Sequence, residues 1–359
     1  MFKLQSTDGK ARAGILKTAH GKVRTPLFMP VATKASFKWV ALQDAEKAGV
    51  ECFISNSYIL SLRPGVPVIK KAGGLHKFMN WDKGIFTDSG GFQLISDELF
   101  LKMNDSGIYF RNPFDKNRDF LTPEKSMQIQ EDIGADVAMA LDDMPRYGSN
   151  AKRLEESAAR TFEWAKRCLD SHNSKKQLLF GIAQGGTNKK RRKKSAEQIS
   201  SLPFDGFALG GLAVGEPKKK MMEMAKINLS IFPGKSPRYL MGLGSPKELI
   251  EAISFGADIF DSCFPTRTAR HGLAFTCKGN IDISKGKFKL DLKPLDEKCG
   301  CPVCKSHSRS YIHHLFKVKE ENGKLLLSTH NIYFITKLMQ DARKAILDGK
   351  FITFKKKFT

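Results

Sequence analysis

Short apolar runs recur along the chain, and stretches with the periodicity of amphipathic helices separate most of them. Each run is bounded by glycine or polar residues, which is typical of strands buried in a sheet. The predicted strands are residues 25–32, 52–55, 84–87, 136–141, 178–183, 206–209, 239–241 and 257–260.

Helix signals lie between these runs. Residues 122–134 begin with a capping hydroxyl, a proline and an acidic residue and end at a glycine, which are the usual start and stop signals of a helix. Residues 37–48 and 152–170 also have a helical pattern. The longer, charged excursion of residues 97–120 predicts an inserted flap.

Eight strands mostly separated by helices are what a (β/α)8 TIM barrel requires, so the predicted fold class is α/β with such a barrel. A doubly wound sheet is the alternative, because it also alternates strands with helices. The number of strands and the absence of a GxGxxG motif after the first strand favour the barrel.

Polar residues and glycines stand directly after these strands. In a barrel they would share one rim, the face that carries active sites. The rim residues singled out in this way are Asp88, Asp142, Gln184, Gly211, Gly242 and Asp261.

Two carboxylates on that rim, Asp88 and Asp261, suggest glycosidic chemistry. One can attack an anomeric carbon while the other moves protons to and from the leaving group. Asp142 and Gln184 offer the acceptors and donors that would recognise the edge of a base. Considered without its neighbours, Asp261 fits a turn residue better than a nucleophile. Together the rim residues indicate an N-glycosidic enzyme that acts on nucleic acid.

The charge balance supports a polyanionic partner. Lys and Arg outnumber Asp and Glu by 60 to 37, which gives a net charge of +23. Arg267 and Arg270, close to Asp261 in the sequence, would hold phosphates. The basic run 189–194 fits a solvated helix face and a direct RNA contact equally. No stretch approaches the roughly 20 apolar residues of a membrane span, and no signal sequence is evident, so we expect a cytoplasmic protein with no membrane partner.

Three of the seven cysteines lie within six residues, which argues against a disulfide framework and for a metal site. With one histidine they complete the tetrahedral shell of a structural Zn²⁺, which leaves no position for water. His330 is the expected fourth ligand because it follows Ser328 and Thr329, which we expect to form a loop. His313 and His314 are alternatives, although their apolar helical surroundings favour packing or hydrogen bonding. The predicted zinc ligands are Cys299, Cys301, Cys304 and His330.

Six motifs closely resemble those of the bacterial-type tRNA-guanine transglycosylases and occur in that family's order. They are TDSGGFQ (87–93), GIAQGG (181–186), GGLAVGE (210–216), MGLGSP (241–246), FDSCFPTRTARHG (260–272) and CGCPVC (299–304). The resemblance covers nearly the whole chain. It implies a homodimer with a barrel and a C-terminal zinc-binding subdomain. It also implies exchange of guanine at the anticodon wobble position of tRNA for a 7-deazaguanine base, in queuosine biosynthesis.

The same resemblance implies roles for individual residues. Asp261 would be the nucleophile on ribose C1′, and Asp88 would protonate the departing guanine and deprotonate the incoming base. Arg267 and Arg270 would contact RNA on either side of the target nucleotide. The residues expected to contact the base are Ser89, Asp142, Gln184, Gly211, Leu212, Glu216 and Met241.

Two positions bear on the choice of base. Where bacterial members often have FDEC, this chain has LDDM, so Met144 would lie over the base in place of cysteine. Queuine-using eukaryotic members share the leucine and the two aspartates. Val214, however, resembles the bacterial pocket, whose bulk disfavours the cyclopentenediol of queuine. We therefore expect 7-aminomethyl-7-deazaguanine, with queuine as the alternative.

Other functions within the same resemblance are a related archaeal-type enzyme and a non-catalytic tRNA-binding partner subunit. A silent subunit would be expected to lose the nucleophile or the rim motifs, whereas Asp88 and Asp261 are both present. We expect the catalytic barrel in residues 1–290 and the zinc-binding subdomain in 291–332. A C-terminal helix in 333–359 is expected to pack back on the barrel.

Overall fold

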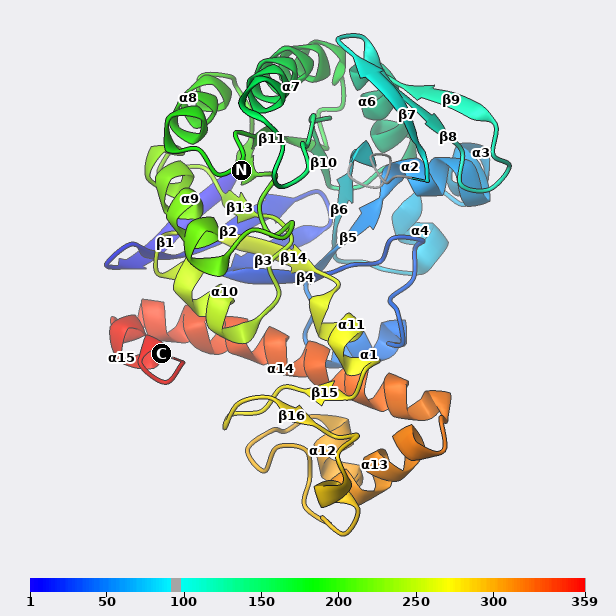
Figure 1. The fold of residues 1–359 in the computed structure, drawn as a ribbon, viewed down its shortest axis with the longest axis vertical. Helices are drawn as coiled ribbons and strands as arrows, with labels where there is room; N and C mark the ends of the chain where they lie inside the picture. The colour runs from blue at the N-terminus through cyan, green and yellow to red at the C-terminus, as the bar shows by residue number, and fades with distance from the viewer. Residues whose placement is uncertain (92–97, 359) are drawn as a thin grey trace.

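Eight parallel strands form a barrel at the centre of the computed structural model, which describes residues 1–91 and 98–358 (Figure 1). A parallel bridge between Val31 and Ile54 joins the two ends of the sheet. The prediction of a (β/α)8 barrel is therefore confirmed, and the doubly wound alternative is wrong. In order around the barrel, the strands are β4 (Leu27–Pro30), β14 (Ile259–Ser262), β13 (Arg238–Leu240), β12 (Gly206–Leu209), β11 (Leu178–Ala183), β10 (Val137–Met139), β6 (Gly84–Asp88) and β5 (Cys52–Asn56).

The strands are apolar on both faces because both faces are covered. Met29, Phe86, Phe180 and Tyr239 point inward and fill the barrel interior. The outward faces pack against helices, which explains the near-continuous apolar runs in the sequence. The helices that follow the central strands are α6 (Pro123–Ile133), α7 (Ala151–Ser171), α8 (Lys189–Ser200), α9 (Lys218–Ile231), α10 (Pro246–Ile253) and α11 (Phe264–Ala269).

The helix predicted at residues 37–48 is shorter than expected. Only α1 (Leu42–Lys47) is helical, because Trp39 has a φ of +61° and Ala41, the residue before the helix, is extended. Phe37 and Val40 are buried in an irregular segment instead. Their apolar spacing imitated a helical face, and this part of the prediction is wrong.

The predicted flap is a small antiparallel sheet of β7 (Phe100–Asn104), β8 (Gly107–Arg111) and β9 (Arg118–Leu121). It lies at one edge of the barrel beside α6 (Figure 1). Two side chains of its central strand β8, Ile108 and Phe110, are fully buried. Phe92, Gln93 and Asp97, which belong to the predicted motif and flap, lie outside the described residues.

Two further parts flank the barrel near the N-terminus. The opening segment forms an antiparallel sheet of β1 (Phe2–Asp8), β2 (Ala11–Thr18) and β3 (Gly21–Thr25). Between β5 and β6 the chain forms three short α-helices and one π-helical turn (Ser61–Gly65), which the sequence pattern did not reveal because prolines and glycines interrupt their periodicity. The three α-helices are α2 (Ser57–Leu60), α3 (Val66–Lys71) and α4 (Leu75–Met79).

A small C-terminal lobe lies next to the barrel, and one long helix connects the two (Figure 1). The lobe contains β15 (Leu273–Ala274), β16 (Ile281–Asp282), α12 (Pro302–Ser306) and α13 (Arg309–Lys317). The long helix, α14 (Glu321–Leu347), continues along the barrel, and α15 (Phe351–Lys355) follows it. Because α14 runs across residue 332, the predicted domain boundary there falls inside a helix, and the division of the chain stays a prediction.

None of the helices in the described parts of the chain is long and apolar enough to cross a membrane.

Candidate active site

A cavity of about 300 Å³ opens at the rim where the barrel strands end. It lies where the sequence predicted a site, because each lining carboxylate stands at or just after the carboxyl end of a strand. Gln184, Glu216 and Arg270 are outside its lining. The lining residues predicted from the sequence are Asp88, Ser89, Asp142, Met144, Gly211, Leu212, Val214, Met241, Gly242, Asp261 and Arg267.

Asp261, at the end of β14, is held by one of its two carboxylate oxygens. Oδ1 accepts hydrogen bonds from Tyr239 Oη at 2.6 Å and from the Gly242 backbone N–H at 3.0 Å. Burial raises the pKa of Asp261, and these two hydrogen bonds oppose that rise. Among the described residues Oδ2 has no hydrogen-bond partner, so one oxygen is fixed and the other can meet a ligand.

Asp88 lines the same cavity from β6, on a tight turn. Its Oδ1 accepts a hydrogen bond from the Gly90 backbone N–H at 2.9 Å. Gly90 has a φ of +84°, and a Cβ there would lie 2.4 Å from Tyr58 Cβ, so only glycine fits this turn. Ser89, between them, is buried and also lines the cavity. Two carboxylates from different strands therefore reach one cavity.

Asp142 and Gln184, which follow β10 and β11, form a hydrogen-bonded pair in which Asp142 is half-buried. Gln184 Nε2 donates to Asp142 Oδ2 at 2.5 Å, and Gln184 is fully buried behind the cavity wall. Gln184 Oε1 is buried with no hydrogen-bond partner among the described residues. Burial raises the pKa of Asp142 to about 6, helped by the neighbouring charge of Asp143 and opposed by the bond from Gln184. Asp142 thus presents its carboxylate to the cavity, while Gln184 holds that carboxylate from behind the wall.

Glu216 holds the loop that carries Leu212 and Val214. Its two carboxylate oxygens accept the backbone N–H groups of Ala213 at 2.6 Å and Val214 at 3.0 Å. The carboxylate is therefore engaged with its own loop in this structure, and a contact with the base stays a prediction. Leu212 and Val214 line the cavity directly.

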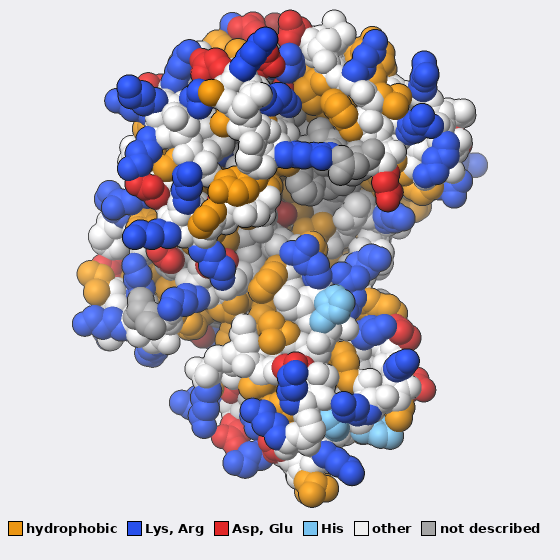
Figure 2. Space-filling view, viewed as in Figure 1, with side chains coloured by type: hydrophobic (Ala, Val, Ile, Leu, Met, Phe, Trp, Pro, Cys, Tyr) orange, Lys and Arg blue, Asp and Glu red, His pale blue; other side chains and the backbone are white. Residues whose placement is uncertain are grey.

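The two predicted RNA-binding arginines belong to the short helix α11. Arg267 is exposed and lines the cavity, whereas Arg270 is partly buried and its Nε lies 3.4 Å from the Thr266 carbonyl oxygen. Figure 2 shows Lys and Arg side chains over the barrel helices and the C-terminal lobe, with few acidic side chains between them. This surface suits a polyanion.

Asp143, which the sequence left unassigned, is fully buried between two arginines of α7. Arg160 Nη1 contacts its Oδ2 at 2.6 Å, and both terminal nitrogens of Arg153 contact its carboxylate. Arg160 also contacts Asp105, in the turn between β7 and β8, at 3.1 Å. Asp143 therefore anchors the segment that follows Asp142.

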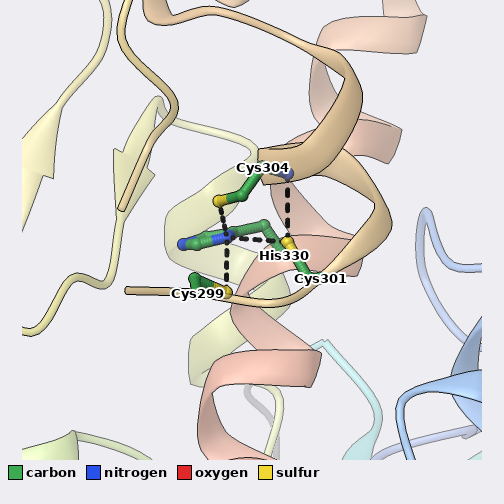
Figure 3. Close-up of side chains that lie close together, drawn as sticks. All are labelled: Cys299, Cys301, Cys304 and His330. Carbon is green, nitrogen blue, oxygen red and sulfur yellow. Dashed lines mark hydrogen bonds between the residues drawn. The ribbon is translucent and has the colours of Figure 1, made fainter. Parts of the chain in front are cut away.

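The predicted metal ligands converge in the C-terminal lobe (Figure 3). His330 Nδ1 lies 3.8, 3.3 and 3.4 Å from the Sγ atoms of Cys299, Cys301 and Cys304. Ligand atoms of a tetrahedral zinc site are roughly 3.6–3.8 Å apart. His330 Nε2 donates to the Phe275 carbonyl oxygen at 2.7 Å, which leaves the Nδ1 lone pair facing the sulfurs. These four residues could hold a metal ion.

The reason given for choosing His330 was partly wrong. Ser328 and Thr329 lie within α14 and form no loop, so the helix itself brings His330 to the cysteines. The choice against the competing histidines is supported for His313, which is buried and contacts the Ile283 carbonyl oxygen at 2.7 Å. His314 is exposed on the other side of α13.

A second group of possible ligands, His20, His76 and Asp136, lies at the opposite end of the barrel. Asp136 precedes β10, and its oxygens already accept the backbone N–H groups of His20 and Ile85. The Lys83 carbonyl oxygen lies 3.1 Å from His76 Nε2 and can only accept a hydrogen bond, so Nε2 is the donor. These three residues are best explained as a hydrogen-bonded cluster that closes the end of the barrel opposite the cavity.

Two contributors to the site were missed at the level of the sequence. Tyr239 was read only as part of an apolar strand, although its hydroxyl holds Asp261. Arg192 was read as part of a basic surface run, although it is fully buried and contacts the loops after β11 and β12. A tyrosine within an otherwise aliphatic strand was the one available signal. The only local sequence signal that distinguishes Arg192 from the other basic residues of the run is its helical spacing, which places it on the buried face of α8.

Comparison with known proteins places these features in one family. The family model described as queuine tRNA-ribosyltransferase matches residues 7–359. The queuine tRNA-ribosyltransferase of Thermotoga neapolitana is 47% identical over 356 residues, which span 99% of this chain and 96% of the relative. That of Fusobacterium nucleatum is 46% identical over 360 residues, with 99% and 96% covered. That of Natranaerobius thermophilus is 44% identical over 354 residues, with 98% and 96% covered.

Proposed function

The chain belongs to the queuine tRNA-ribosyltransferase family of pentosyltransferases, and we propose that it exchanges guanine at the wobble position of tRNA for a 7-deazaguanine base. One observation carries the proposal: Asp88 and Asp261 line a single cavity together with Asp142 and Gly211. A nucleophile, a proton carrier and groups for a base are the set that base exchange at a ribose requires.

In the first half-reaction Asp261 attacks ribose C1′. A bond forms between the carboxylate oxygen and C1′, the C1′–N9 bond breaks, and N9 of the departing guanine takes the electron pair and a proton from Asp88. The fixed Oδ1 of Asp261 orients the carboxylate, and the unpartnered Oδ2 is the atom placed to attack.

In the second half-reaction Asp88 accepts the N9 proton of the incoming base, N9 attacks C1′, and the bond to Asp261 breaks. Asp88 ends with the proton that it lost, so the cycle is balanced. Two displacements at C1′ retain the sugar configuration, as in retaining glycosidases. The target nucleotide must leave the anticodon stack to reach a cavity of this size.

Base recognition falls to Asp142, Gln184 and Gly211. The ionised Asp142 carboxylate can accept two N–H groups of guanine, and the Gly211 backbone N–H can donate to its carbonyl oxygen. Gln184 supports this assignment from behind the cavity wall, because its Nε2 donates to the Asp142 carboxylate and fixes the direction of that side chain. Ser89 and Met241 complete the walls, Leu212 and Glu216 face the 7-substituent, and Arg267 and Arg270 hold flanking phosphates.

For the incoming base we favour 7-aminomethyl-7-deazaguanine. Val214 and Met144 both line the cavity, and their side chains take up the space that the cyclopentenediol of queuine would need. Queuine remains the alternative substrate. A non-catalytic tRNA-binding subunit is disfavoured because both carboxylates reach the cavity.

For the metal we propose Zn²⁺ on Cys299, Cys301, Cys304 and His330, within a subdomain of residues 291–332. Three thiolates and one imidazole fill a tetrahedral shell, so the ion would supply folding energy and no open coordination position. We further propose a cytoplasmic homodimer with tRNA as its partner, a state that sedimentation analysis with and without tRNA can test.

The decisive experiment is incorporation of labelled guanine into undermodified tRNA, with 7-aminomethyl-7-deazaguanine and queuine as competitors. We expect incorporation, stronger competition by the aminomethyl base, and a covalent RNA–protein complex on denaturing gels. Asp261→Asn, which is nearly isosteric, should abolish the complex and lower incorporation at least about 10³-fold. A complex that still forms in this variant would show that another residue is the nucleophile. Stronger competition by queuine would reverse the choice of base.

A further inference from the structure

The basic run Lys189–Lys194 begins helix α8, and its members do not share one environment. Lys189, Lys190, Lys193 and Lys194 are exposed, whereas the Arg192 side chain is completely buried. The helical period explains the difference. Ser195, Ala196 and Ile199, which lie three, four and seven positions after Arg192, are the other buried residues of α8.

Within residues 1–91 and 98–358, the hydrogen bonds of the buried guanidinium all go to backbone carbonyl oxygens. Its Nε donates to Gly186 O at 2.6 Å, Nη1 to Gly210 O at 2.8 Å and to Ala183 O at 3.3 Å. Its Nη2 donates to Gly211 O at 3.1 Å. No carboxylate among the described residues forms an ion pair with it. Ala183 is the last residue of β11, and the other three carbonyls belong to the segments directly after β11 and β12, so one side chain joins two neighbouring rim loops.

A buried arginine without a paired acid is unfavourable, because the charge loses its hydration. Burial lowers the pKa of Arg192 to about 9, and the charge of Glu216 opposes that change only in part. An apolar residue would avoid this cost and could still pack against the barrel. The carbonyl contacts are therefore what distinguishes arginine at this position.

The contacts fix the direction of the peptide groups that line the cavity. In a trans peptide the C=O and the following N–H point in opposite directions. Arg192 holds the Gly210 carbonyl on the helix side, which turns the Gly211 N–H away from α8. Gly210 and Gly211 both line the cavity. The loop has little freedom to adjust, since a Cβ at Gly211 would lie 2.3 Å from Gln184 Oε1.

We propose that Arg192 is a positioning residue for base recognition: it orients the Gly211 N–H and fixes the backbone on both sides of Gln184. The inference rests on the proposed function, since it concerns how the same cavity reads the base. It also separates Arg192 from the four lysines of the basic run, whose side chains are exposed at the surface where RNA could reach them.

The test compares Arg192→Gln with Lys193→Gln, which changes the next residue of the same run on its exposed face. Guanine exchange is measured with the guanine and the tRNA concentrations varied separately, and circular dichroism and thermal melting check the fold. We expect Arg192→Gln to raise the KM for guanine about tenfold or more, as for lost hydrogen bonds, while the KM for tRNA stays within about twofold. Lys193→Gln should leave the KM for guanine unchanged.

A conservative variant keeps the test decisive if Arg192→Gln does not fold. Arg192→Lys retains the charge and some of the donors, so it should give an intermediate KM for guanine with an unchanged KM for tRNA. An unchanged KM for guanine in the folded variants, or a rise confined to the KM for tRNA, would overturn the inference. If the wild-type protein incorporates no guanine, it is the proposed function that fails.

Discussion

Asp261 and Asp142 both stand at strand ends on the barrel rim, but their carboxylate oxygens have different hydrogen-bond partners. Asp261 has one oxygen held by Tyr239 and Gly242 and one oxygen that no group in the described part of the chain contacts by a hydrogen bond. Asp142 is bonded to a neutral amide, and its pKa is raised to about 6 by burial. A carboxylate with a free oxygen suits bond formation, whereas one beside an amide suits hydrogen bonding to a base. The environment of each residue thus supports a different task.

The raised pKa of Asp142 predicts how base binding depends on pH. Above about pH 6 the Asp142 carboxylate is ionised and accepts two N–H groups of guanine. Below about pH 6 the carboxyl group is neutral and is a poorer acceptor of these hydrogen bonds. The KM for guanine should therefore rise about tenfold between pH 7 and pH 5, since about one-tenth of the carboxyl is ionised at pH 5. Initial rates with guanine varied at saturating tRNA measure this.

The matched control is Asp142→Asn, whose side chain does not titrate. Its KM for guanine should be high at both pH values, so the tenfold change should disappear. A wild-type KM for guanine that is the same at pH 7 and pH 5 would exclude Asp142 as the group that reads the N–H edge.

At the level of elements, helix α7 supports the segment after β10. Asp143 is buried against Arg153 and Arg160, and Arg160 continues to Asp105 in the flap sheet. The segment that carries Asp142 is therefore joined to a helix, and that helix to the flap. Removing the shared carboxylate takes this partner from both partly buried arginines and leaves Arg160 with exposed Asp105 alone, and loss of one member of a buried ion pair is the costly way to break it.

We predict that Asp143→Ala lowers the free energy of unfolding by about 3 kcal/mol. Asp105→Ala is the control, because it removes the other acidic partner of Arg160 from a side chain that is 93% exposed. That change should cost less than about 1 kcal/mol. Urea unfolding followed by tryptophan fluorescence measures both, and equal losses would show that Asp143 is no anchor.

Elements could be predicted where their signal is local. Asp88, Asp142 and Asp261 were found because each stands at or directly after an apolar run, and the parallel barrel then gathers strand ends on one rim. Arg192 could not be found, because a basic residue in a basic run looks the same whether its helix turns it inward or outward. The helix at residues 37–48 was overextended because buried Phe37 and Val40 keep a helical spacing in an irregular segment.

At the level of the whole molecule, α14 connects the proposed metal ligands to the barrel rim. His330 faces the three cysteines, and the next residue, Asn331, donates to the carbonyl oxygens of Pro265 and Leu273. Pro265 belongs to α11, the helix of Arg267. The net charge of +23 explains attraction to a polyanion, but this helix decides where the arginine stands.

We predict that Cys301→Ser, which removes a buried ligand, releases the zinc, makes the C-terminal lobe sensitive to proteases and raises the KM for tRNA. Cys277→Ser is the matched control, because Cys277 is exposed and outside the cluster. Elemental analysis should find one zinc per chain in the wild type and the control and none in Cys301→Ser. Equal zinc content in all three proteins would refute the site.

The position of α14 in the chain also bears on synthesis. This helix leaves the ribosome after every barrel strand, yet it contacts β1, β2 and β4 from the start of the chain. Arg343 donates to the carbonyl oxygens of Gly14 and Thr25, at 2.8 and 2.6 Å. A nascent chain that has not reached His330 lacks both the last metal ligand and this cover for its first sheet. Zinc uptake would therefore separate finished chains from truncated ones.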